Sequence, residues 1–334
     1  MGREQILLGS SSDFEIFNRN STQRSPDSDS GLIHRRHRVA EVFSHVFPTE
    51  VTIYNNALEE ARQMRENGYS FIIPYSHSEM RDPVDAIRTV IDFGGKFDNA
   101  EYTGPVAYHQ NTFYMKALAS LIEMNAVPIV TANTIEKGKN LEPTPFKIKI
   151  EDLFSSAIHQ LPGTSTKLPL PRKELKARES LREYIHEAAV TLANQGIVFI
   201  APQGGRNPEL GQAIGRPNEM IINEAQRLGV DMDKVAFWPM GIMAVGKNTG
   251  IHNPNHGLRA SLGRKANINL GVPITLSELQ SDAREQSIEK GRKVNIDQRI
   301  FEELAGLLPE SYSKVEYSQK MPKSGQSPTS KNSS

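Results

Sequence analysis

The sequence predicts an α/β fold with a mostly parallel central sheet covered by helices. Three observations predict it: short apolar runs with β-branched residues, segments of helical apolar spacing between those runs, and glycines or prolines where one kind of segment ends. Strands that alternate with helices form mostly parallel sheets, with helices on both faces. The 334 residues are enough for one large domain or two modest ones.

The predicted strands are the short apolar runs. The first is Phe71 to Pro74, and most of the others also end at or near a proline. Runs of this length and composition are typical of buried strands. They cover residues 71–74, 127–130, 197–201, 235–239 and 267–273.

The predicted helices repeat apolar residues every three or four positions. Gly68 is well suited to end the first helix, and Pro83 to begin the second. Residues 141–171 are rich in proline and are expected to form a loop-rich stretch. The helices cover residues 51–67, 83–92, 113–124, 174–194 and 217–228.

Composition divides the chain into four parts. Residues 1–30 and 313–334 are rich in serine and charged residues and are expected to be disordered tails. Between them lie an N-terminal helical region, residues 31–68, and an α/β domain, residues 69–312. The basic cluster His34 to Arg38 fits a solvated helix start, or contact with a lipid headgroup or an acidic carrier protein.

Composition also excludes several classes of function. Lys+Arg and Asp+Glu both number 39, so no bulk charge favours nucleic acid or a strongly anionic membrane. Absence of cysteine excludes disulfides, thiolate catalysis and cysteine-ligated metals. No apolar run approaches the roughly 20 residues that span a bilayer, and Ile6 to Leu8 is too short for a signal-peptide core. We therefore expect a soluble intracellular protein, cytoplasmic or inside an organelle. Since His109, His252 and His256 form no metal-ligand set, we expect no metal.

His77 and Asp82 follow the first predicted strand. An imidazole can accept a hydroxyl proton, while a carboxylate fixes its tautomer and stabilises the imidazolium. The pair can meet only if a turn joins them, which Asp82 as N-cap and Pro83 at the first helical position indicate. The alternative is a histidine with a structural role only. Glu79 and Arg81 are expected to be solvated or at the rim, with a phosphate contact as a second option for Arg81.

A second cluster, Gly204, Gly205 and Arg206, follows another predicted strand. Glycines let backbone N–H groups approach an anion, and a guanidinium suits phosphate. Lys137 and Lys139, just past a third strand, are further candidate cations. Because the carboxyl ends of parallel strands lie along one sheet edge, these residues and His77 can face each other. A surface ion pair for Arg206 and a solvated loop for the lysines are the competing interpretations.

Together these residues resemble the glycerolipid acyltransferase family of the His-x4-Asp type. Its members share a His-x4-Asp motif, a Pro-x-Gly-x-Arg motif and a late strand with a proline. Residues 113–130 occupy the place of the family's intervening block, and order and spacing agree over about residues 70–275. The three motifs here are His77 to Asp82, Pro202-Gln203-Gly204-Gly205-Arg206 and Phe237-Trp238-Pro239.

Departures from the family pattern indicate which branch of the family the chain resembles most. Most members have an acidic residue and a Thr or Ser where this chain has Gln203 and Gly205. The Gly-Gly-Arg form is more similar to the soluble, plastid-type glycerol-3-phosphate acyltransferases. Those proteins carry an extra N-terminal helical region, comparable with residues 35–68 here. The block after Val130 lacks the arginine usual in many relatives, and Lys137 or Lys139 is expected to replace it.

The resemblance implies transfer of a fatty acyl group from acyl carrier protein or a coenzyme A thioester to the sn-1 hydroxyl of glycerol 3-phosphate. The product would be lysophosphatidate, an intermediate of phospholipid biosynthesis. Transfer would be direct, with no cofactor beyond the acyl donor, no nucleic acid, and only peripheral contact with a membrane. The implied base and its partner are His77 and Asp82, and the implied phosphate ligands are Arg206, Gly204, Gly205 and Lys137 or Lys139.

Three alternatives remain open. Lysophosphatidate or dihydroxyacetone phosphate can be the acceptor of the same reaction. A lipid- or phosphate-binding protein without catalysis can retain the scaffold, although pure binding needs neither His77 nor Asp82. A hydrolase lacks a Gly-x-Ser-x-Gly elbow, and spacing does not assign a nucleophile to Ser76 or Ser78.

Overall fold

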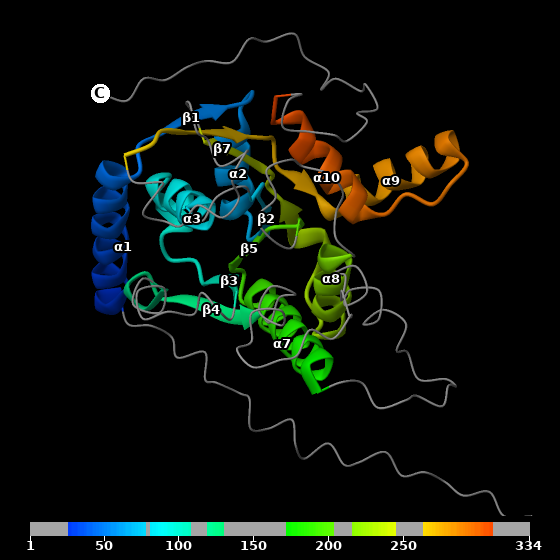
Figure 1. Ribbon diagram of the computed structural model, residues 1–334, viewed down its shortest axis with the longest axis horizontal. Helices are drawn as coiled ribbons and strands as arrows, with labels where there is room; N and C mark the ends of the chain where they lie inside the picture. Colours follow the sequence, from blue (N-terminus) through cyan, green and yellow to red (C-terminus); the bar gives the residue numbers. More distant parts are fainter. Residues whose placement is uncertain are drawn as a thin grey trace, which may run out of the picture.

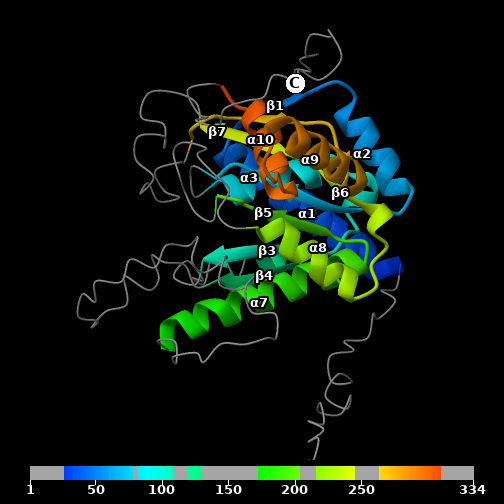
Figure 2. The same ribbon diagram turned by 90° about the vertical axis from the view of Figure 1, so that its right-hand side faces the viewer.

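The computed structural model shows two β-sheets with helices packed around them (Figures 1 and 2). It describes residues 26–77, 81–107, 119–129, 172–203, 216–244 and 263–309. The helices are α1 (Pro26–Val46), α2 (Ala57–Glu66), α3 (Asp82–Asp92), α7 (Arg172–Ala193), α8 (Pro217–Arg227), α9 (Leu276–Lys290) and α10 (Ile296–Gly306). The strands are β1 (Thr49–Ile53), β2 (Ser70–Pro74), β3 (Tyr102–Ala107), β4 (Met124–Ile129), β5 (Ile197–Ile200), β6 (Val235–Phe237), β7 (Met240–Ala244), β8 (Ala266–Leu270) and β9 (Ile274–Thr275).

The larger sheet has the strand order β4-β3-β5-β2-β6-β9. All its strand pairs are parallel except β6 with β9, so the expected mostly parallel sheet is confirmed. The smaller sheet has the order β1-β8-β7, with β1 and β8 parallel and β7 antiparallel to β8. The fold is therefore α/β, with one sheet more than the sequence predicts.

Strand β2 lies inside the larger sheet, and its side chains alternate between two apolar cores. Ile72 joins the core built with α7, α8, α9 and α10. Phe71 and Ile73 join the core built with α1, α2, α3 and the smaller sheet. A strand buried on both faces needs apolar residues at every position, which is why this segment is a continuous apolar run in the sequence.

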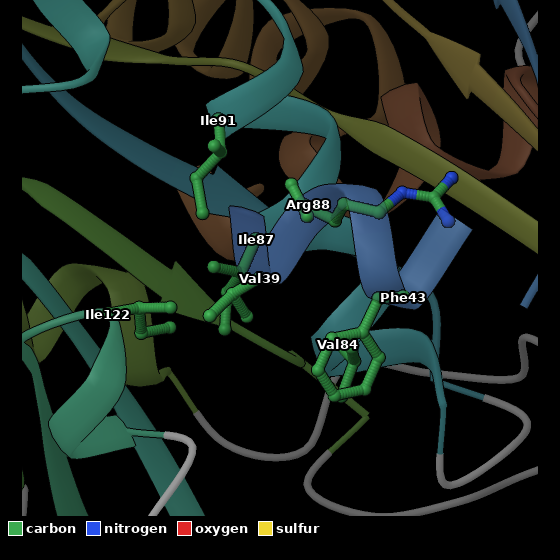
Figure 3. Close-up of a pocket in the computed structure, with 8 residues that line it drawn as sticks. Val39, Phe43, Val84, Ile87, Arg88, Ile91 and Ile122 are labelled. Atoms are coloured by element: carbon green, nitrogen blue, oxygen red, sulfur yellow. The ribbon is translucent and has the colours of Figure 1, made fainter. Parts of the chain in front are cut away.

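Helix α1 packs against α3 around a small apolar pocket (Figure 3). Arg88 lies at its edge, with the guanidinium directed away from the apolar side chains and donating to the Phe47 carbonyl at 2.7 Å. The stem of Arg88 thus covers apolar surface while its charge binds polar groups. The other lining residues are Val39, Ala40, Phe43, Val84, Ile87, Ile91 and Ile122.

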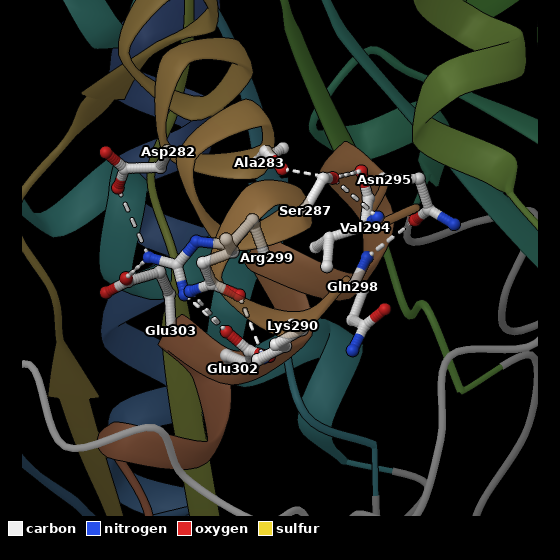
Figure 4. Close-up of polar contacts among 11 residues, drawn as sticks. Asp282, Ala283, Ser287, Lys290, Val294, Asn295, Gln298, Arg299, Glu302 and Glu303 are labelled. Atoms are coloured by element: carbon white, nitrogen blue, oxygen red, sulfur yellow. Dashed lines mark hydrogen bonds and ion pairs between the residues drawn. The ribbon is translucent and has the colours of Figure 1, made fainter. Parts of the chain in front are cut away.

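Helices α9 and α10 pack against each other and are joined through Gly291, whose positive φ of 60° suits glycine. Between them, Arg299 forms ion pairs with Glu302, Glu303 and Asp282 (Figure 4). The Thr275 side chain and Glu278 form a capping box at the start of α9. Neither helix is predicted from the sequence, although in α10 the buried Ile296, Ile300 and Leu304 do recur at helical spacing.

The predicted helix over residues 51–67 is wrong in its first part. Val51, Thr52 and Ile53 belong to β1, which pairs in parallel with β8, and α2 begins only at Ala57. β-branched residues suit a strand, and pairing with a distant segment decides the outcome. The N-terminal region is therefore not purely helical, since it supplies one strand to the smaller sheet.

The N-terminal tail is shorter than expected. Helix α1 begins at Pro26, a residue favoured in the first turn, although the tail is predicted to continue to residue 30. Residues 1–25 and the C-terminal tail, residues 313–334, lie outside the described residues.

The basic cluster on α1 is only partly solvated. His34, Arg35 and Arg38 are exposed, but Arg36 is fully buried. Its guanidinium donates to backbone carbonyls and lies 4.1 Å from the centroid of the Tyr102 ring. Backbone carbonyls accept hydrogen bonds from its Nε and Nη1, which makes Arg36 structural. The accepting carbonyls belong to Ile122 (2.8 Å), Ala100 (2.9 Å) and Asp98.

The five predicted strands are confirmed as β2, β4, β5, β6 and β8, with bounds that differ by at most three residues. Strand β3 is not predicted, because Gly104 and Pro105 within it suggest a turn. It pairs with β5 only at Tyr102 and Thr103, so Pro105 lies beyond the part that has neighbours on both sides. The helices predicted over 83–92, 174–194 and 217–228 are confirmed as α3, α7 and α8.

The helix predicted over residues 113–124 is described only from residue 119 on. Residues 119–121 are helical, but β4 already begins at Met124. Parallel pairing of Met124 with Tyr102 extends the strand toward the helix.

Candidate active site

His77 lies just beyond the carboxyl end of β2, and its backbone is held from two sides. The preceding Ser76 donates through Oγ to the Ile242 carbonyl (3.0 Å) and accepts from the Ile242 N–H (2.7 Å). The N–H of His77 itself donates to Oε1 of Gln203 at 2.5 Å. The His77 side chain stays 15% exposed, so a ligand can reach a ring whose backbone is fixed.

Asp82 is the first residue of α3, and its side chain is almost completely buried. Its Oδ2 lies 3.5 Å from Nδ1 of His77. This distance is longer than the roughly 2.7–3.2 Å of a hydrogen bond, but catalytic hydrogen bonds often tighten only when substrate is bound. The expected meeting of His77 and Asp82 is confirmed. Because Asp82 lies in the first turn of a helix, the helix dipole also favours its negative charge.

The expected capping arrangement is one residue off. Arg81, not Asp82, occupies the N-cap position of α3, and Pro83 follows in the first turn. Arg81 also departs from the expectation of a solvated or rim residue: it is fully buried and paired with Asp85. Its guanidinium donors are bound to protein groups, which argues against the phosphate contact.

Tyr75 borders the pair from the strand side. Its ring meets the His77 ring edge-on, with centroids 6.0 Å apart. Burial raises the pKa of the Tyr75 phenol well above its usual value, and the nearby Asp82 carboxylate raises it further. Tyr75 is therefore a neutral phenol at any physiological pH and adds no charge to the site.

The register of β2 with β5 brings two motifs together that are far apart in the sequence. Pro74 lies opposite Ile200 in this parallel pair, so both strands end at the same sheet edge. His77 follows β2 by three residues and Gln203 follows β5 by three, and their hydrogen bond joins the two segments. The prediction that these segments face each other is confirmed as far as Gln203.

Strand β6 places the late motif beside the same edge. It pairs with β2 on the side opposite β5, and the Trp238 N–H donates to the Ile72 carbonyl at 2.9 Å. Trp238 is fully buried, and its Nε1 donates to the Gly271 carbonyl at 3.0 Å. Packing rather than substrate contact explains Trp238. Three of the motifs therefore follow or lie on three neighbouring strands, β5, β2 and β6.

The predicted phosphate ligands lie outside the described residues. These are Gly204, Gly205, Arg206, Lys137 and Lys139. The described ranges end at residue 203, just before the two glycines and Arg206, and at residue 129, before the two lysines. The phosphate site therefore stays a prediction.

Gln203 is the functional candidate that sequence reasoning missed. The sequence marks it only as a departure from the acidic residue usual in the family at that position. Its buried side chain supplies the acceptor for the backbone N–H of His77. The only hint of this bond in the sequence is that both motifs follow predicted strands of a parallel sheet, whose ends lie along one edge.

A second histidine–carboxylate pair joins α7 and α8. His186 Nδ1 lies 2.9 Å from Oε1 of Glu224, which also binds Arg227. The Arg227 bonds, with a smaller contribution from His186, lower the pKa of Glu224 to about 2. This pair lies on helices rather than at the sheet edge, and its histidine is more exposed than His77, so an inter-helix ion pair explains it.

The described part of the chain offers neither a cluster of metal ligands nor a membrane-spanning helix. In that part of the chain, no three His, Asp or Glu side chains are grouped so that they could hold a metal ion. No helix there is both long and apolar enough to cross a bilayer.

No protein-family model matches the chain, and no curated protein resembles it at a significant level.

Proposed function

We propose that this protein transfers a fatty acyl group from a thioester of acyl carrier protein or coenzyme A to the sn-1 hydroxyl of glycerol 3-phosphate. The observation that carries the proposal is the meeting of two motifs at one sheet edge: His77, 3.5 Å from Asp82, is bonded through its backbone to Gln203 of the second motif. A pure binding protein has no need of a partly exposed imidazole against a buried carboxylate.

In this proposal His77 is the general base. Its Nδ1 faces Asp82, which leaves Nε2 to accept the proton of the substrate hydroxyl. The oxygen then attacks the thioester carbonyl carbon, and the carbon–sulfur bond breaks. The proton on His77 goes to the departing sulfur, which restores the base. Such a base contributes roughly 10²–10⁴-fold to the rate.

The substrate phosphate is assigned by the resemblance alone. Arg206, the backbone of Gly204 and Gly205, and Lys137 or Lys139 would hold it. Holding the phosphate places the hydroxyl between His77 and the thioester, and orientation of this kind supplies a large share of catalysis.

The test is acyl transfer by the purified full chain from labelled acyl carrier protein and acyl coenzyme A. Glycerol 3-phosphate, dihydroxyacetone phosphate and lysophosphatidate are offered separately as acceptors. We expect transfer to glycerol 3-phosphate that falls at least about 100-fold in a folded His77→Ala variant. If the protein transfers acyl groups only to one of the other acceptors, the mechanism stands but the assignment of glycerol 3-phosphate as acceptor is wrong.

His186→Ala is the matched control, because it removes a second imidazole that faces a carboxylate. It should leave transfer unchanged. Equal loss in both variants would contradict the assignment of His77. If the wild-type protein transfers acyl groups to none of the three acceptors but binds glycerol 3-phosphate, a binding protein would be the better conclusion.

A further inference from the structure

Arg81, directly before Asp82, is one of the largest side chains that the fold buries completely. Its guanidinium makes two bonds to the buried Asp85, from Nε to Oδ2 at 2.5 Å and from Nη2 to Oδ1 at 3.2 Å. A two-bond pair fixes the plane of a guanidinium as well as its position. Burying two charges is costly, so the pair calls for a reason beyond stability.

The remaining bonds of Arg81 reach the smaller sheet. Nη2 donates to the Pro48 carbonyl at 3.2 Å, and Nη1 donates to the Arg264 carbonyl. Pro48 directly precedes β1, and Arg264 lies just before β8. Arg81 therefore connects the first turn of α3 to the starts of two neighbouring strands.

A second contact strengthens this connection. Arg88, two turns further along α3, donates to the Phe47 carbonyl at 2.7 Å and also binds the Thr49 side chain. The Arg81 guanidinium carbon lies 5.1 Å from the centroid of the Phe47 ring. The segment Phe47 to Thr49 is thus held by two arginines of the helix that carries Asp82.

His77 is attached to the same small sheet by its other edge. Ser76 makes two hydrogen bonds with Ile242 of β7, and the Ser76 N–H donates to the Met240 carbonyl at 3.2 Å. Because β8 lies between β7 and β1, the sheet links the His77 backbone to the contacts of Arg81. The contacts of both segments with this sheet therefore fix the separation between His77 and Asp82.

We propose that Arg81, held by Asp85, is a positioning residue that places Asp82 against Nδ1 of His77, with the three-stranded sheet as its support. The inference rests on the proposed function only in assuming that His77 and Asp82 act as a catalytic base and its partner. The resemblance to acyltransferases does not assign either residue, since Arg81 is one of the variable positions between His77 and Asp82.

The competing explanation is that Arg81 and Asp85 serve only the stability of the fold. The tautomer of His77 distinguishes the two. A carboxylate against Nδ1 keeps the proton there and leaves Nε2 unprotonated, whereas an imidazole without that partner exchanges between tautomers. Nitrogen chemical shifts of the ring report the tautomer directly and need no enzymatic activity.

The experiment compares the full chain with an Arg81→Met/Asp85→Leu double variant. Removing both charges together avoids an unpaired buried ion. Ring nitrogen shifts are measured by NMR at about pH 8.5, where an ordinary imidazole is neutral, and His77→Gln identifies the resonance. We expect one Nδ1–H tautomer in the wild type and a mixture in the variant. Acyl transfer should lose about 100-fold in kcat with KM changed less than about twofold.

Arg36→Met is the matched control. It removes an equally buried arginine whose guanidinium binds Asp98, Ala100 and Ile122, away from His77. It should lower thermal stability without changing the His77 tautomer. A folded double variant that keeps the wild-type tautomer would overturn the inference.

Two further outcomes are also decisive. If the wild type transfers no acyl group, the proposed function fails, but the tautomer comparison still judges the positioning role. If the double variant does not fold, Arg81→Lys takes its place, since it keeps the charge opposite Asp85 but loses the two-bond geometry. The wild-type tautomer in folded Arg81→Lys, with unchanged kcat, would also refute the role of Arg81.

Discussion

Gln203 offers the sharpest test of how the two motifs are joined. Its buried Oε1 accepts the backbone N–H of His77 at 2.5 Å. Replacement by leucine keeps a similar volume and removes the acceptor. A buried N–H left without a partner costs about 1–3 kcal/mol, so Gln203→Leu should lower the free energy of unfolding by up to that amount.

Part of this cost should fall on catalysis instead, because the segment after β2 can move to find another acceptor. Since about 1.4 kcal/mol is a factor of ten in rate, the whole cost expressed as lost catalysis would lower kcat/KM by between about fivefold and 150-fold. Gln203→Glu keeps an acceptor at the same place and restores the acidic residue common in the resembling family. It should recover most of the lost activity.

Urea unfolding followed by tryptophan fluorescence measures the stability part. The chain has one tryptophan, Trp238, which is fully buried, so its emission reports unfolding of the core. The matched control is Gln286→Leu, another buried glutamine, which binds Glu302 between α9 and α10 at 3.1 Å. It should destabilise without changing kcat/KM. A Gln203→Leu protein within about 0.5 kcal/mol and twofold of wild type would show that the bond does not hold His77.

Two further predictions concern stability. Asp297, on α10, accepts hydrogen bonds at 3.0 Å from the N–H groups of Asn218 and Glu219 at the start of α8, and at 2.8 Å from the Asn218 side chain. It takes the place of an N-cap for α8, so Asp297→Ala should destabilise by about 2–4 kcal/mol in urea unfolding, with Glu289→Ala at an exposed position of α9 as a control near zero. The second concerns Glu224, whose pKa is lowered to about 2 by Arg227 and His186. A lowered carboxyl pKa stabilises the fold above the unfolded value of 4.5, and this contribution is lost as the pH falls toward 2. Because Arg227 is exposed, we expect it to be about 1 kcal/mol or less. The difference between wild type and Glu224→Gln, followed by urea unfolding, should therefore shrink between pH 4.5 and 2, and a difference that grows there would contradict the assignment.

The fold could be predicted where local pattern and tertiary environment agree. The apolar run of β2 and the helical spacing of α3 both satisfy the core in which they lie. Prediction failed at Val51 to Ile53, where pairing with β8 overrides a helical pattern. It also missed β3, where Gly104 and Pro105 suggest a turn but lie past the part of the strand with two neighbours.

The candidate site also has a part that the sequence predicts and a part that only the tertiary structure reveals. The meeting of His77 and Asp82 follows from short-range pattern, because a strand, a turn and Pro83 leave few arrangements for the chain between them. The roles of Gln203 and Arg81 do not follow, since their partners are distant in the sequence. Arg81 is the clearest case: a charged residue expected at the surface is buried because Asp85 and two backbone carbonyls satisfy it.

The sequence alone determined four strands of the larger sheet, β2, β4, β5 and β6, and which side chains can do acid–base chemistry, because period, glycine and proline act within a few residues. Only the tertiary structure decided what surrounds that chemistry. It placed Gln203 against the backbone of His77 and tied Asp82 to the small sheet through Arg81. Those contacts depend on strand order and register, which are set by the packing of the whole chain and leave no local pattern in the sequence.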